Sequence, residues 1–173
     1  MSVAPFVLVC ALLTLAAWGN PAEEGVAFLD TVATRKDVYR LPSGTIVKFL
    51  TKGTGAKSPR IDDDCDVHYS GTLPDGTKFD SSYDRGAPAT FKPNQVIAGW
   101  TEALQLMREG DKWTIYHPFD LAYGASGSPP SIPPFSPLVF DIELIEVKGP
   151  GKPASEAQAT LRKKLAKRYA EFK

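Results

Sequence analysis

The chain has 173 residues, which suits one domain with extensions, and its 15 prolines and 14 glycines favour a turn-rich, β-dominated fold over a helical bundle. The 20 basic and 20 acidic residues give a formal net charge of zero, which argues against a nucleic-acid-binding protein, because such proteins carry a net basic field. Two isolated histidines and two cysteines, one of them in an N-terminal apolar run, argue against a zinc site or an internal disulfide, so we expect no metal and no cofactor.

The first element is an apolar run over residues 5–18, which is short for a membrane span of ~20 residues. It fits the hydrophobic region of a secretory signal peptide, and Ala17-Trp18-Gly19 supplies a small-residue cleavage pattern. We therefore expect residues 1–19 to be a signal peptide, the protein to be secreted, and no stable membrane insertion after cleavage. Because no Lys or Arg precedes the run, an uncleaved anchor stays open as the alternative.

An N-terminal extension over residues 20–40 follows. It contains a short predicted helix, Pro21 to Thr34, whose apolar stripe comprises Ala22, Val26, Leu29 and Ala33. A helix of this length is marginal on its own, so we expect it to dock on the body of the protein.

Strand patterns cover residues 45–50, 65–71, 112–117 and 138–147. In the second of these, Cys65 alternates in phase with inward-facing residues, which predicts a buried small hydrophobe, while His68 points outward to solvent. Asp75-Gly76 is a hairpin turn signal. The acidic triplet at residues 62–64 lacks the ligand spacing of a calcium loop, so we interpret it as a solvated loop.

The central predicted helix runs from Gln95 to Arg108, and Gly110 is suited to a left-handed cap. Its apolar residues recur at intervals of three and four: Val96, Ile97, Trp100, Ala103, Leu104 and Met107. A single short helix in a β-rich domain must pack against the sheet. Trp100 lies near its N-terminal end, where a large ring can form the floor of a pocket; the alternative is that Trp100 is ordinary core.

The last part of the chain begins with a proline-rich loop over residues 122–137, and a loop of this length without its own secondary structure is often functional. A linker over residues 148–153 leads to a predicted helix capped by Ser155. Its apolar stripe comprises Leu161, Leu165, Tyr169 and Phe172, and its basic face comprises Arg162, Lys163, Lys164, Lys167 and Arg168. Docking on the domain, a solvated tail, and contact with a partner or an acidic surface all remain open.

Five motifs stand in a recognisable order: Val67-His68-Tyr69-Ser70-Gly71, the run from Asp75 to Ser82, Leu121-Ala122-Tyr123-Gly124, Ile132-Pro133-Pro134, and the run from Leu138 to Leu144. In this order and at these spacings the chain resembles the FKBP-type peptidyl-prolyl cis-trans isomerases. The segment from Pro88 to Tyr116 most resembles the macrophage infectivity potentiator (Mip) branch.

The resemblance covers residues 41–147 and implies an FKBP-type isomerase domain there, with the linker and basic helix at 148–173. The fold we expect is α+β: a strongly twisted antiparallel sheet of about five strands wrapped around the helix Gln95–Arg108, with two short flanking helices. In the Mip branch a long N-terminal helical region makes a dimer. That region is cut to two or three turns here, so we expect a monomer.

Isomerisation faces a barrier of ~18–20 kcal/mol set by amide resonance, and its catalyst needs no nucleophile or metal. A water-poor aromatic pocket favours the twisted amide, which has less charge separation than the planar one. The resemblance implies Asp80, Tyr123, Trp100 and Ile97 as catalytic residues. It implies a binding site made of Tyr69, Phe79, Arg85, Phe91, Val96, Ile97, Trp100, Tyr123, Ile132 and Phe140.

Within that set, the resemblance makes Trp100 the floor for the proline ring and directs the Tyr123 hydroxyl at the substrate carbonyl. The N–H of Ile97, near the helix start, is a spare donor. Asp80 would lie at the rim, held by Tyr69 and Arg85; orienting, electrostatic and structural roles fit it equally, and an ordinary surface pair with Arg85 is the alternative.

Proline-containing peptides and proteins are the implied substrates, and macrolides such as rapamycin the implied inhibitors. The chain departs from the best-known small members at Ala89, Ser128, Ser131 and Phe135, which bears on subsite preference and macrolide affinity. The competing hypotheses are a non-catalytic binding module that uses the same pocket or the C-terminal helix, and a general folding helper.

Overall fold

The computed structural model describes the backbone over residues 20–171 and the side chains over residues 20–165. The helices are α1 (Pro21–Ala33), α2 (Ala98–Leu106) and α3 (Ala154–Glu171). The strands are β1 (Tyr39–Arg40), β2 (Ile46–Thr51), β3 (Lys57–Ser58), β4 (Cys65–Thr72), β5 (Lys78–Ser81), β6 (Ala89–Phe91), β7 (Lys112–His117), β8 (Leu138–Val147) and β9 (Lys152–Pro153). None of the helices within the described range has the length and apolar character needed to cross a bilayer.

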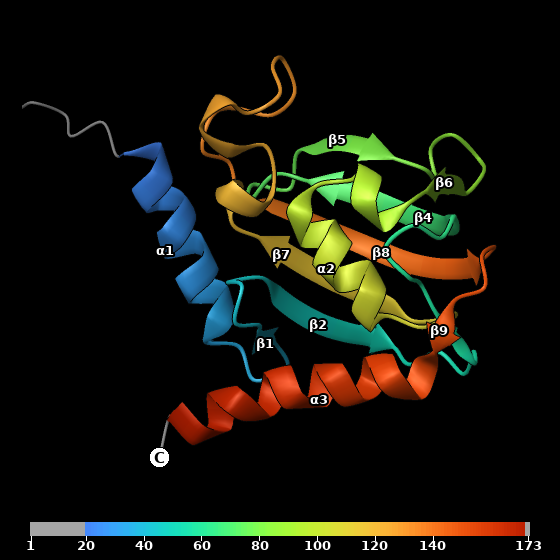
Figure 1. Cartoon of the computed structure of the whole chain (residues 1–173). Helices are drawn as coiled ribbons and strands as arrows, with labels where there is room; N and C mark the ends of the chain where they lie inside the picture. The colour runs from blue at the N-terminus through green and yellow to red at the C-terminus, as the bar shows by residue number, and fades with distance from the viewer. Residues whose placement is uncertain (1–19, 172–173) are drawn as a thin grey trace, which may run out of the picture.

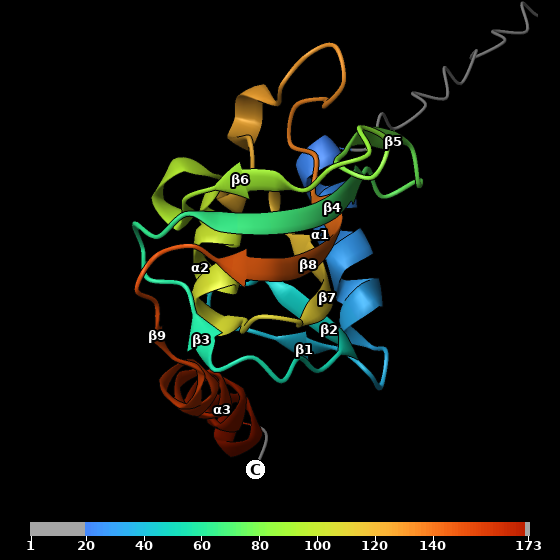
Figure 2. The same ribbon diagram turned by 90° about the vertical axis from the view of Figure 1, so that its right-hand side faces the viewer.

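The main sheet is antiparallel, with strand order β1-β2-β7-β8-β4-β5, and β6 pairs with β4 beside β5. Figures 1 and 2 show α2 on one face of this sheet, which we call the inner face, and α1 on the opposite, outer face. The predicted α+β class, with one short helix against an antiparallel sheet and two flanking helices, is confirmed. The sheet has seven strands where about five were predicted, because β1 and β6 contain only two and three residues and carry no readable periodicity.

Alternation along the strands divides the apolar residues between two clusters. Along β8, Leu138, Phe140, Ile142 and Leu144 are buried, and they pack in the larger cluster on the inner face with α2. On the outer face, Ile46 and Tyr116 meet Leu29 and Val32 of α1 in a second cluster. Burying a side chain of this size contributes roughly 1.5–3 kcal/mol, so the inner cluster fixes α2, and with it Trp100, against the sheet.

Helix α2 is shorter than predicted at both ends. It begins at Ala98, after a turn of 3-10 helix at Pro93–Gln95, and ends at Leu106. The carboxylate of Asp111 accepts the N–H of Arg108 at 2.9 Å, which turns the chain away from the helix axis. Gly110 does adopt a left-handed conformation, with φ of 83°, but in this following turn and not as the helix cap.

The predicted apolar stripe of α1 was wrong at Val26, which is 53% exposed. The buried face comprises Gly25, Leu29 and Val32 instead. Gly25 lies close to the end of the proline-rich loop: a Cβ there would stand 3.1 Å from Cδ of Pro137. The helix is therefore rotated toward that loop, a tertiary contact that periodicity does not reveal.

The C-terminal region docks on the domain. Within the predicted linker, β9 pairs with β3. Helix α3 begins at Ala154, so Ser155 lies in its first turn and is not its cap. Leu161 is buried and Leu165 packs against the inner cluster, as the predicted stripe requires. The predictions for Lys167, Arg168, Tyr169 and Phe172, like those for residues 1–19, lie outside the described side chains.

Two polar residues at the start of β4, Asp63 and Cys65, are both buried. Cys65 is buried and unpaired, and burial raises the pKa of its thiol to about 12, which suits the predicted inert hydrophobe. Asp63, predicted to be solvated with the rest of its triplet, is buried. Its carboxylate accepts the N–H of Arg60 at 2.7 Å, which compensates the loss of water.

Candidate active site

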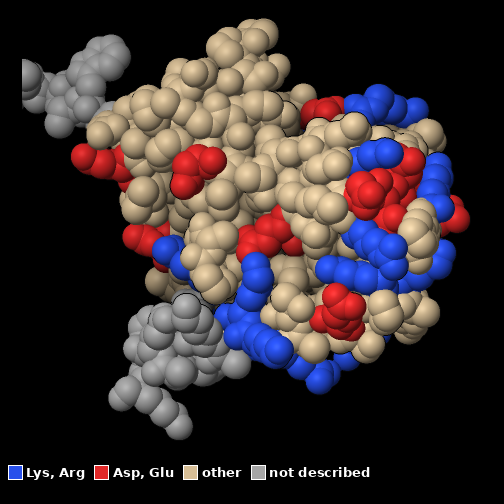
Figure 3. Space-filling model, viewed as in Figure 1, with Lys and Arg blue, Asp and Glu red and all other residues tan. Residues whose placement is uncertain are grey.

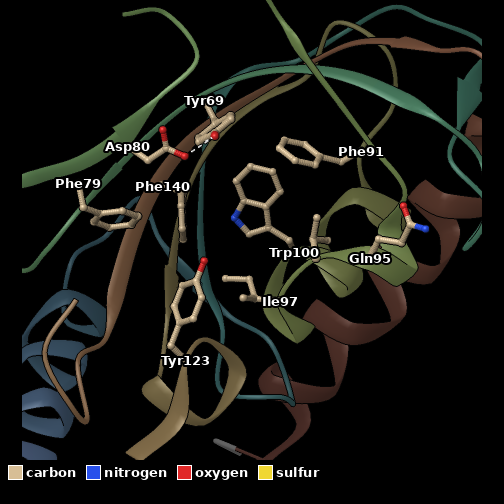
Figure 4. A pocket seen from close by; sticks show the side chains of 10 residues that line it. Tyr69, Phe79, Asp80, Phe91, Gln95, Ile97, Trp100, Tyr123 and Phe140 are labelled. Atoms are coloured by element: carbon tan, nitrogen blue, oxygen red, sulfur yellow. Dashed lines mark hydrogen bonds between the residues drawn. The ribbon is translucent and has the colours of Figure 1, made fainter. Parts of the chain in front are cut away.

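A pocket of about 460 Å³ opens on the inner face at the N-terminal end of α2 (Figure 4). This volume lies in the usual range for small-ligand sites. The pocket is lined by Tyr69, Phe79, Asp80, Phe91, Gln95, Val96, Ile97, Trp100, Tyr123 and Phe140. These residues come from β4, β5, β6, β8, the start of α2 and the loop after β7, so the whole fold is needed to bring them together.

The floor of the pocket is the indole of Trp100, which is only 4% exposed. Three rings meet it nearly at right angles: Tyr69 and Phe140 with centroids 5.1 Å away, and Phe91 at 5.8 Å. Such edge-to-face pairs are favourable by about 0.5–1.5 kcal/mol each beyond area burial. The indole is therefore held in one orientation, and Figure 4 shows it at the centre of the site.

Gly71 makes room for the aromatic wall beside Trp100. A Cβ at this position would lie 2.6 Å from the Phe79 ring and 2.8 Å from the Phe140 ring. Those two rings pack edge to face, with centroids 5.5 Å apart. A side chain at Gly71 would thus push one of them into the pocket.

The rim on the β5 side carries a three-residue polar cluster. The Tyr69 hydroxyl donates to Oδ2 of Asp80 at 2.5 Å, and Nη2 of Arg85 donates to that hydroxyl at 2.7 Å. Nη1 of Arg85 also donates to Oδ1 of Asp80, which closes the triangle. Figure 4 shows the carboxylate beside the Tyr69 hydroxyl at the edge of the pocket, with Phe79 and Phe140 below it.

The electrostatics of this cluster favour an ionised carboxylate. Partial burial alone would raise the pKa of Asp80, but the hydrogen bonds from Tyr69 and Arg85, with the charge of Arg85, outweigh it and hold the pKa below its ordinary value. Burial, and then the hydrogen bond to Asp80, raise the pKa of Tyr69. At neutral pH the site therefore presents a fixed negative charge next to a neutral phenol.

Two donors face the pocket from the opposite side. Ile97 is the N-cap of α2, and its own N–H makes no hydrogen bond within the described part of the chain. Tyr123 is 44% exposed, and Figure 4 shows its hydroxyl directed toward Ile97 and Phe140. A carbonyl group bound over Trp100 could accept from either donor.

The structure gathers most of the predicted site residues around this one cavity. Ile132 is different: it is buried in the inner cluster, and backbone hydrogen bonds of 2.8 and 3.0 Å tie it to Ser128. It shapes the loop over residues 122–137 from beneath, without lining the pocket. Arg85 stands behind the rim as the partner of Asp80. Gln95 lines the pocket and was missed, since a lone polar residue before a helix carries no periodic signal.

All four residues that depart from small family members, Ala89, Ser128, Ser131 and Phe135, lie outside the pocket lining. Phe135 has a φ of 58° and packs edge to face on Phe119 at 5.3 Å. Ala89 pairs with Val67 in the sheet and packs against the inner cluster. No cluster of three or more His, Cys, Asp or Glu side chains suitable for a metal occurs over residues 20–165.

Comparison with known proteins gives a consistent result. Residues 55–145 match the family described as FKBP-type peptidyl-prolyl cis-trans isomerase. The chain is 54% identical over 141 residues to the macrophage infectivity potentiator of Trypanosoma cruzi, covering 80% of this chain and 72% of that protein. It is 47% identical over 137 residues to the outer membrane protein MIP of Legionella longbeachae, covering 77% of this chain but only 58% of the relative.

A solved structure resembles the fold as a whole. The crystal structure of a peptidyl-prolyl cis-trans isomerase from Pseudomonas syringae pv. tomato superimposes with a TM-score of 0.70 at 41% sequence identity. The match covers 75% of this chain and 94% of that one.

Proposed function

The chain belongs to the FKBP-type peptidyl-prolyl cis-trans isomerases, and we propose that it rotates Xaa-Pro bonds in the pocket above Trp100. The observation that carries this assignment is the aromatic cage: one indole held edge-on by three rings, with a carboxylate at its rim. The proline ring of the substrate lies on the face of Trp100, and the preceding carbonyl lies near the two free donors.

The chemistry follows from the amide itself. For Xaa-Pro the cis and trans forms differ by only ~0.5–1 kcal/mol, so both are populated, and the enzyme acts by lowering the barrier between them. The planar amide is more dipolar than the twisted one. A pocket walled by Phe79, Phe91 and Phe140 withholds the water that stabilises the planar form and so favours the twisted form.

Each polar group has a distinct proposed role. Tyr123 and the N–H of Ile97 orient the carbonyl oxygen without restoring conjugation to nitrogen. Asp80, kept ionised by Tyr69 and Arg85, supplies a negative potential on the far side of the amide, where it orients the substrate. These roles rest on the placement of the groups around one cavity.

The proposed substrates are proline-containing peptides and unfolded segments of proteins. The loop over residues 122–137, which borders the pocket, contains no charged residue. In Figure 3 the upper part of the molecule is mostly uncharged; charges of both signs gather to the right and below, and acidic groups also lie on the left. This supports selection by shape and not by charge on that side. We also propose that a macrolide such as rapamycin competes for the pocket, as the family resemblance implies and the apolar, aromatic lining supports.

We further propose that residues 1–19 direct the protein into the secretory pathway. The apolar run at residues 5–18 supports this, and one relative is itself named as an outer membrane protein. The domain division we propose is an extension at 20–40, an isomerase domain at 41–147 and a C-terminal element at 148–173. β1 and β9 link the flanking parts to the domain through strand pairing.

The test is exchange spectroscopy by NMR on a short Xaa-Pro peptide with a catalytic amount of residues 20–173, with and without rapamycin. We expect faster cis-trans exchange that the drug suppresses. The variant Trp100→Leu should lose most of the acceleration, and the exposed control Ile145→Ala should keep it. A folded protein that binds the peptide without accelerating exchange would contradict the proposed site and favour the binding-module alternative.

A further inference from the structure

The segment that joins β5 to β6, residues 82–88, occupies a gap at the edge of β4. β5 pairs with β4 from Ser70 to Thr72, and β6 pairs with it from Cys65 to Val67. His68 and Tyr69 lie between these two stretches and have no partner strand on that side. Their side chains point to opposite faces of the sheet, His68 outward and Tyr69 toward the pocket.

Ser82 closes this gap. Its N–H donates to the carbonyl of Tyr69 at 3.0 Å, and its Oγ accepts the N–H of Tyr69 at 2.8 Å. The same Oγ lies 3.0 Å from Nδ1 of His68. Ser82 is fully buried, so these contacts act in a water-poor setting. The linking segment is thus attached to the centre of β4 at His68 and Tyr69.

On the outer face of the sheet, Tyr83 holds the segment. Its ring stacks on the His68 imidazole with centroids 4.5 Å apart and an interplanar angle of 11°. Its hydroxyl donates to Oε2 of Glu143 at 3.1 Å and accepts from Nζ of Lys112 at 3.3 Å. In the sheet, Glu143 of β8 pairs with His68 of β4 on one side and with Lys112 of β7 on the other. Tyr83 therefore contacts three adjacent strands.

On the inner face, two residues later, Arg85 reaches Tyr69 and Asp80. Its guanidinium carbon also lies 5.4 Å from the centroid of the Tyr69 ring. The N–H of Gly86 donates to the carbonyl of Tyr83 at 3.0 Å, and Gly86 has a φ of 76°, so residues 83–86 form a tight turn. The segment therefore straddles β4, with Tyr83 on one face and Arg85 on the other.

We propose that Tyr83 is a positioning residue for the isomerase reaction: by clamping this segment to the outer face of the sheet, it holds Arg85 against Tyr69 and Asp80 in the pocket. Arg85 is half exposed on a long side chain, and without a fixed backbone it would lose its two-point contact with the rim. The inference rests on the proposed role of the Asp80 cluster.

The competing explanation is that Tyr83 only covers the outer face and adds general stability. The two explanations predict different results when Arg85 is also removed. If Tyr83 acts through Arg85, removing Tyr83 has no further effect on activity once Arg85 is gone. If Tyr83 only adds general stability, its removal adds to the defect of Arg85→Ala. A double-mutant cycle between Tyr83 and Arg85 therefore separates them.

The experiment compares Tyr83→Ala, Arg85→Ala and the double variant, using kcat and KM from NMR line shapes on an Xaa-Pro peptide. We expect each single variant to lower kcat/KM about three- to tenfold, corresponding to the loss of one oriented contact. The double variant should be no worse than Arg85→Ala. Tyr83→Phe keeps the stack on His68 and should retain most of the activity.

The matched control is Ile145→Ala, which removes an outer-face side chain of similar exposure, 40% against 42% for Tyr83. It should leave kcat/KM unchanged. A second readout needs no activity: the Arg85 guanidinium protons should show slow rotation and slow water exchange in the intact protein and in Ile145→Ala, and fast exchange in Tyr83→Ala.

Additive losses in the double variant, or an immobile Arg85 guanidinium in Tyr83→Ala, would overturn the proposal. So would Arg85→Ala with full activity. An inactive wild-type chain would refute the proposed site instead, and the guanidinium readout would still test the clamp, so the two failures are distinguishable.

Discussion

At the level of single residues, the pocket combines an apolar cage with one ionised group, and the two parts depend on each other. Tyr69 belongs to both: its ring packs on Trp100 and its hydroxyl donates to Asp80. A change in the carboxylate is therefore transmitted directly to the cage.

The charge of Asp80 can be removed with little change of shape. We expect Asp80→Asn to lower kcat/KM about tenfold, because the amide supplies no negative potential and releases Arg85. Stability should change by less than about 1 kcal/mol, since the pair with Arg85 is half exposed. The matched control is Asp84→Asn, which breaks an exposed ion pair with Lys78 next to the same turn. Equal activity of Asp80→Asn and wild type would show that the carboxylate is only structural.

The ionisation of Asp80 also predicts how activity responds to pH. Its pKa is held below the ordinary value of 3.8, so it stays ionised throughout the range above that value. The activity that depends on this carboxylate should be constant from pH 8 down to about 5. A titration of kcat/KM over this range checks it, and a fall in activity with an apparent pKa above 5 that disappears in Asp80→Asn would contradict it.

His117 gives an independent prediction about stability. It is completely buried, with Nδ1 3.3 Å from Oγ1 of Thr45 and the ring against Gly99 of α2, and burial lowers its pKa from 6.5 to about 3. The unfolded chain thus binds a proton that the folded chain refuses between about pH 6.5 and 3. The free energy of unfolding should fall as pH decreases through this window, by at most about 1.4 kcal/mol per unit from this group. Urea unfolding at a series of pH values measures this. The free energy of unfolding of His117→Gln should depend less steeply on pH between 6.5 and 3 than that of wild type, and an equal pH dependence would contradict the assignment.

The residue scale also shows what the sequence could reveal. The cluster of Tyr69, Asp80 and Arg85 was expected from the motifs, and the structure does bring the three together. Gln95 could not be identified, because nothing in its neighbours marks a lone amide as a lining residue. His68 points outward as predicted, but it is partly buried, because Tyr83 stacks on it through a turn whose path no local pattern specifies.

At the level of elements, α3 stabilises the back of α2. Lys164 pairs with Glu102 of α2, and Nε2 of Gln158 donates to the carbonyl of Leu106 at 3.4 Å. Leu161 is buried between α3 and the sheet. These contacts lie on the side of α2 away from the pocket, so they support the helix without taking part in the chemistry.

This arrangement predicts that stability and activity separate at α3. Leu161→Ala should lower the free energy of unfolding by about 2–4 kcal/mol, because it leaves a cavity. At a temperature where the variant remains folded, kcat/KM should stay close to that of wild type. Lys163→Ala, on the exposed side of the same helix, should change neither quantity. A folded Leu161→Ala protein with a large loss of kcat would indicate that α3 acts on the site directly.

The strands were easier to predict from sequence than the ends of the helices. The run from Leu138 to Val147 alternates clearly, and β8 has the predicted limits. The end of α2 depends on the carboxylate of Asp111, which also accepts the N–H of Gly53 at 2.7 Å from a distant part of the chain. Such a long-range capture cannot be read from the local pattern around Gly110, so the helix was predicted too long.

At the level of the whole molecule, the flanking helices bury apolar residues against the chain's own domain over the part whose side chains the structure describes, residues 20–165. The buried face of α1 comprises Gly25, Leu29 and Val32, so it is not available to a second copy of the chain. Of the large apolar residues of α1, only Val26 is strongly exposed. We therefore expect residues 20–173 to sediment as a monomer at micromolar concentration, with a sedimentation coefficient that does not change with protein concentration. A concentration-dependent dimer that Val26→Asp abolishes would contradict this.

The arrangement of the elements was predicted on other grounds than the elements themselves. Periodicity indicated strands and helices, but the wrapping of an antiparallel sheet around one helix and the location of the pocket followed from the resemblance of five motifs to a known family. The strand order was not predicted. Where the chain has a part that the resemblance does not cover, as in α3, the sequence left docking and solvation open, because only tertiary contacts decide between them.

In the proposed mechanism, an Xaa-Pro segment is rotated on the face of Trp100. The most direct measurement is a titration of labelled residues 20–173 with an Xaa-Pro peptide, following the two indole N–H signals while peptide exchange is recorded in the same sample. We predict that the Trp100 signal shifts together with accelerated exchange, and that Trp113, buried at the opposite end of the inner cluster under α3, does not respond. Accelerated exchange with an unchanged Trp100 signal, or with shifts centred on Trp113 and α3, would contradict the account.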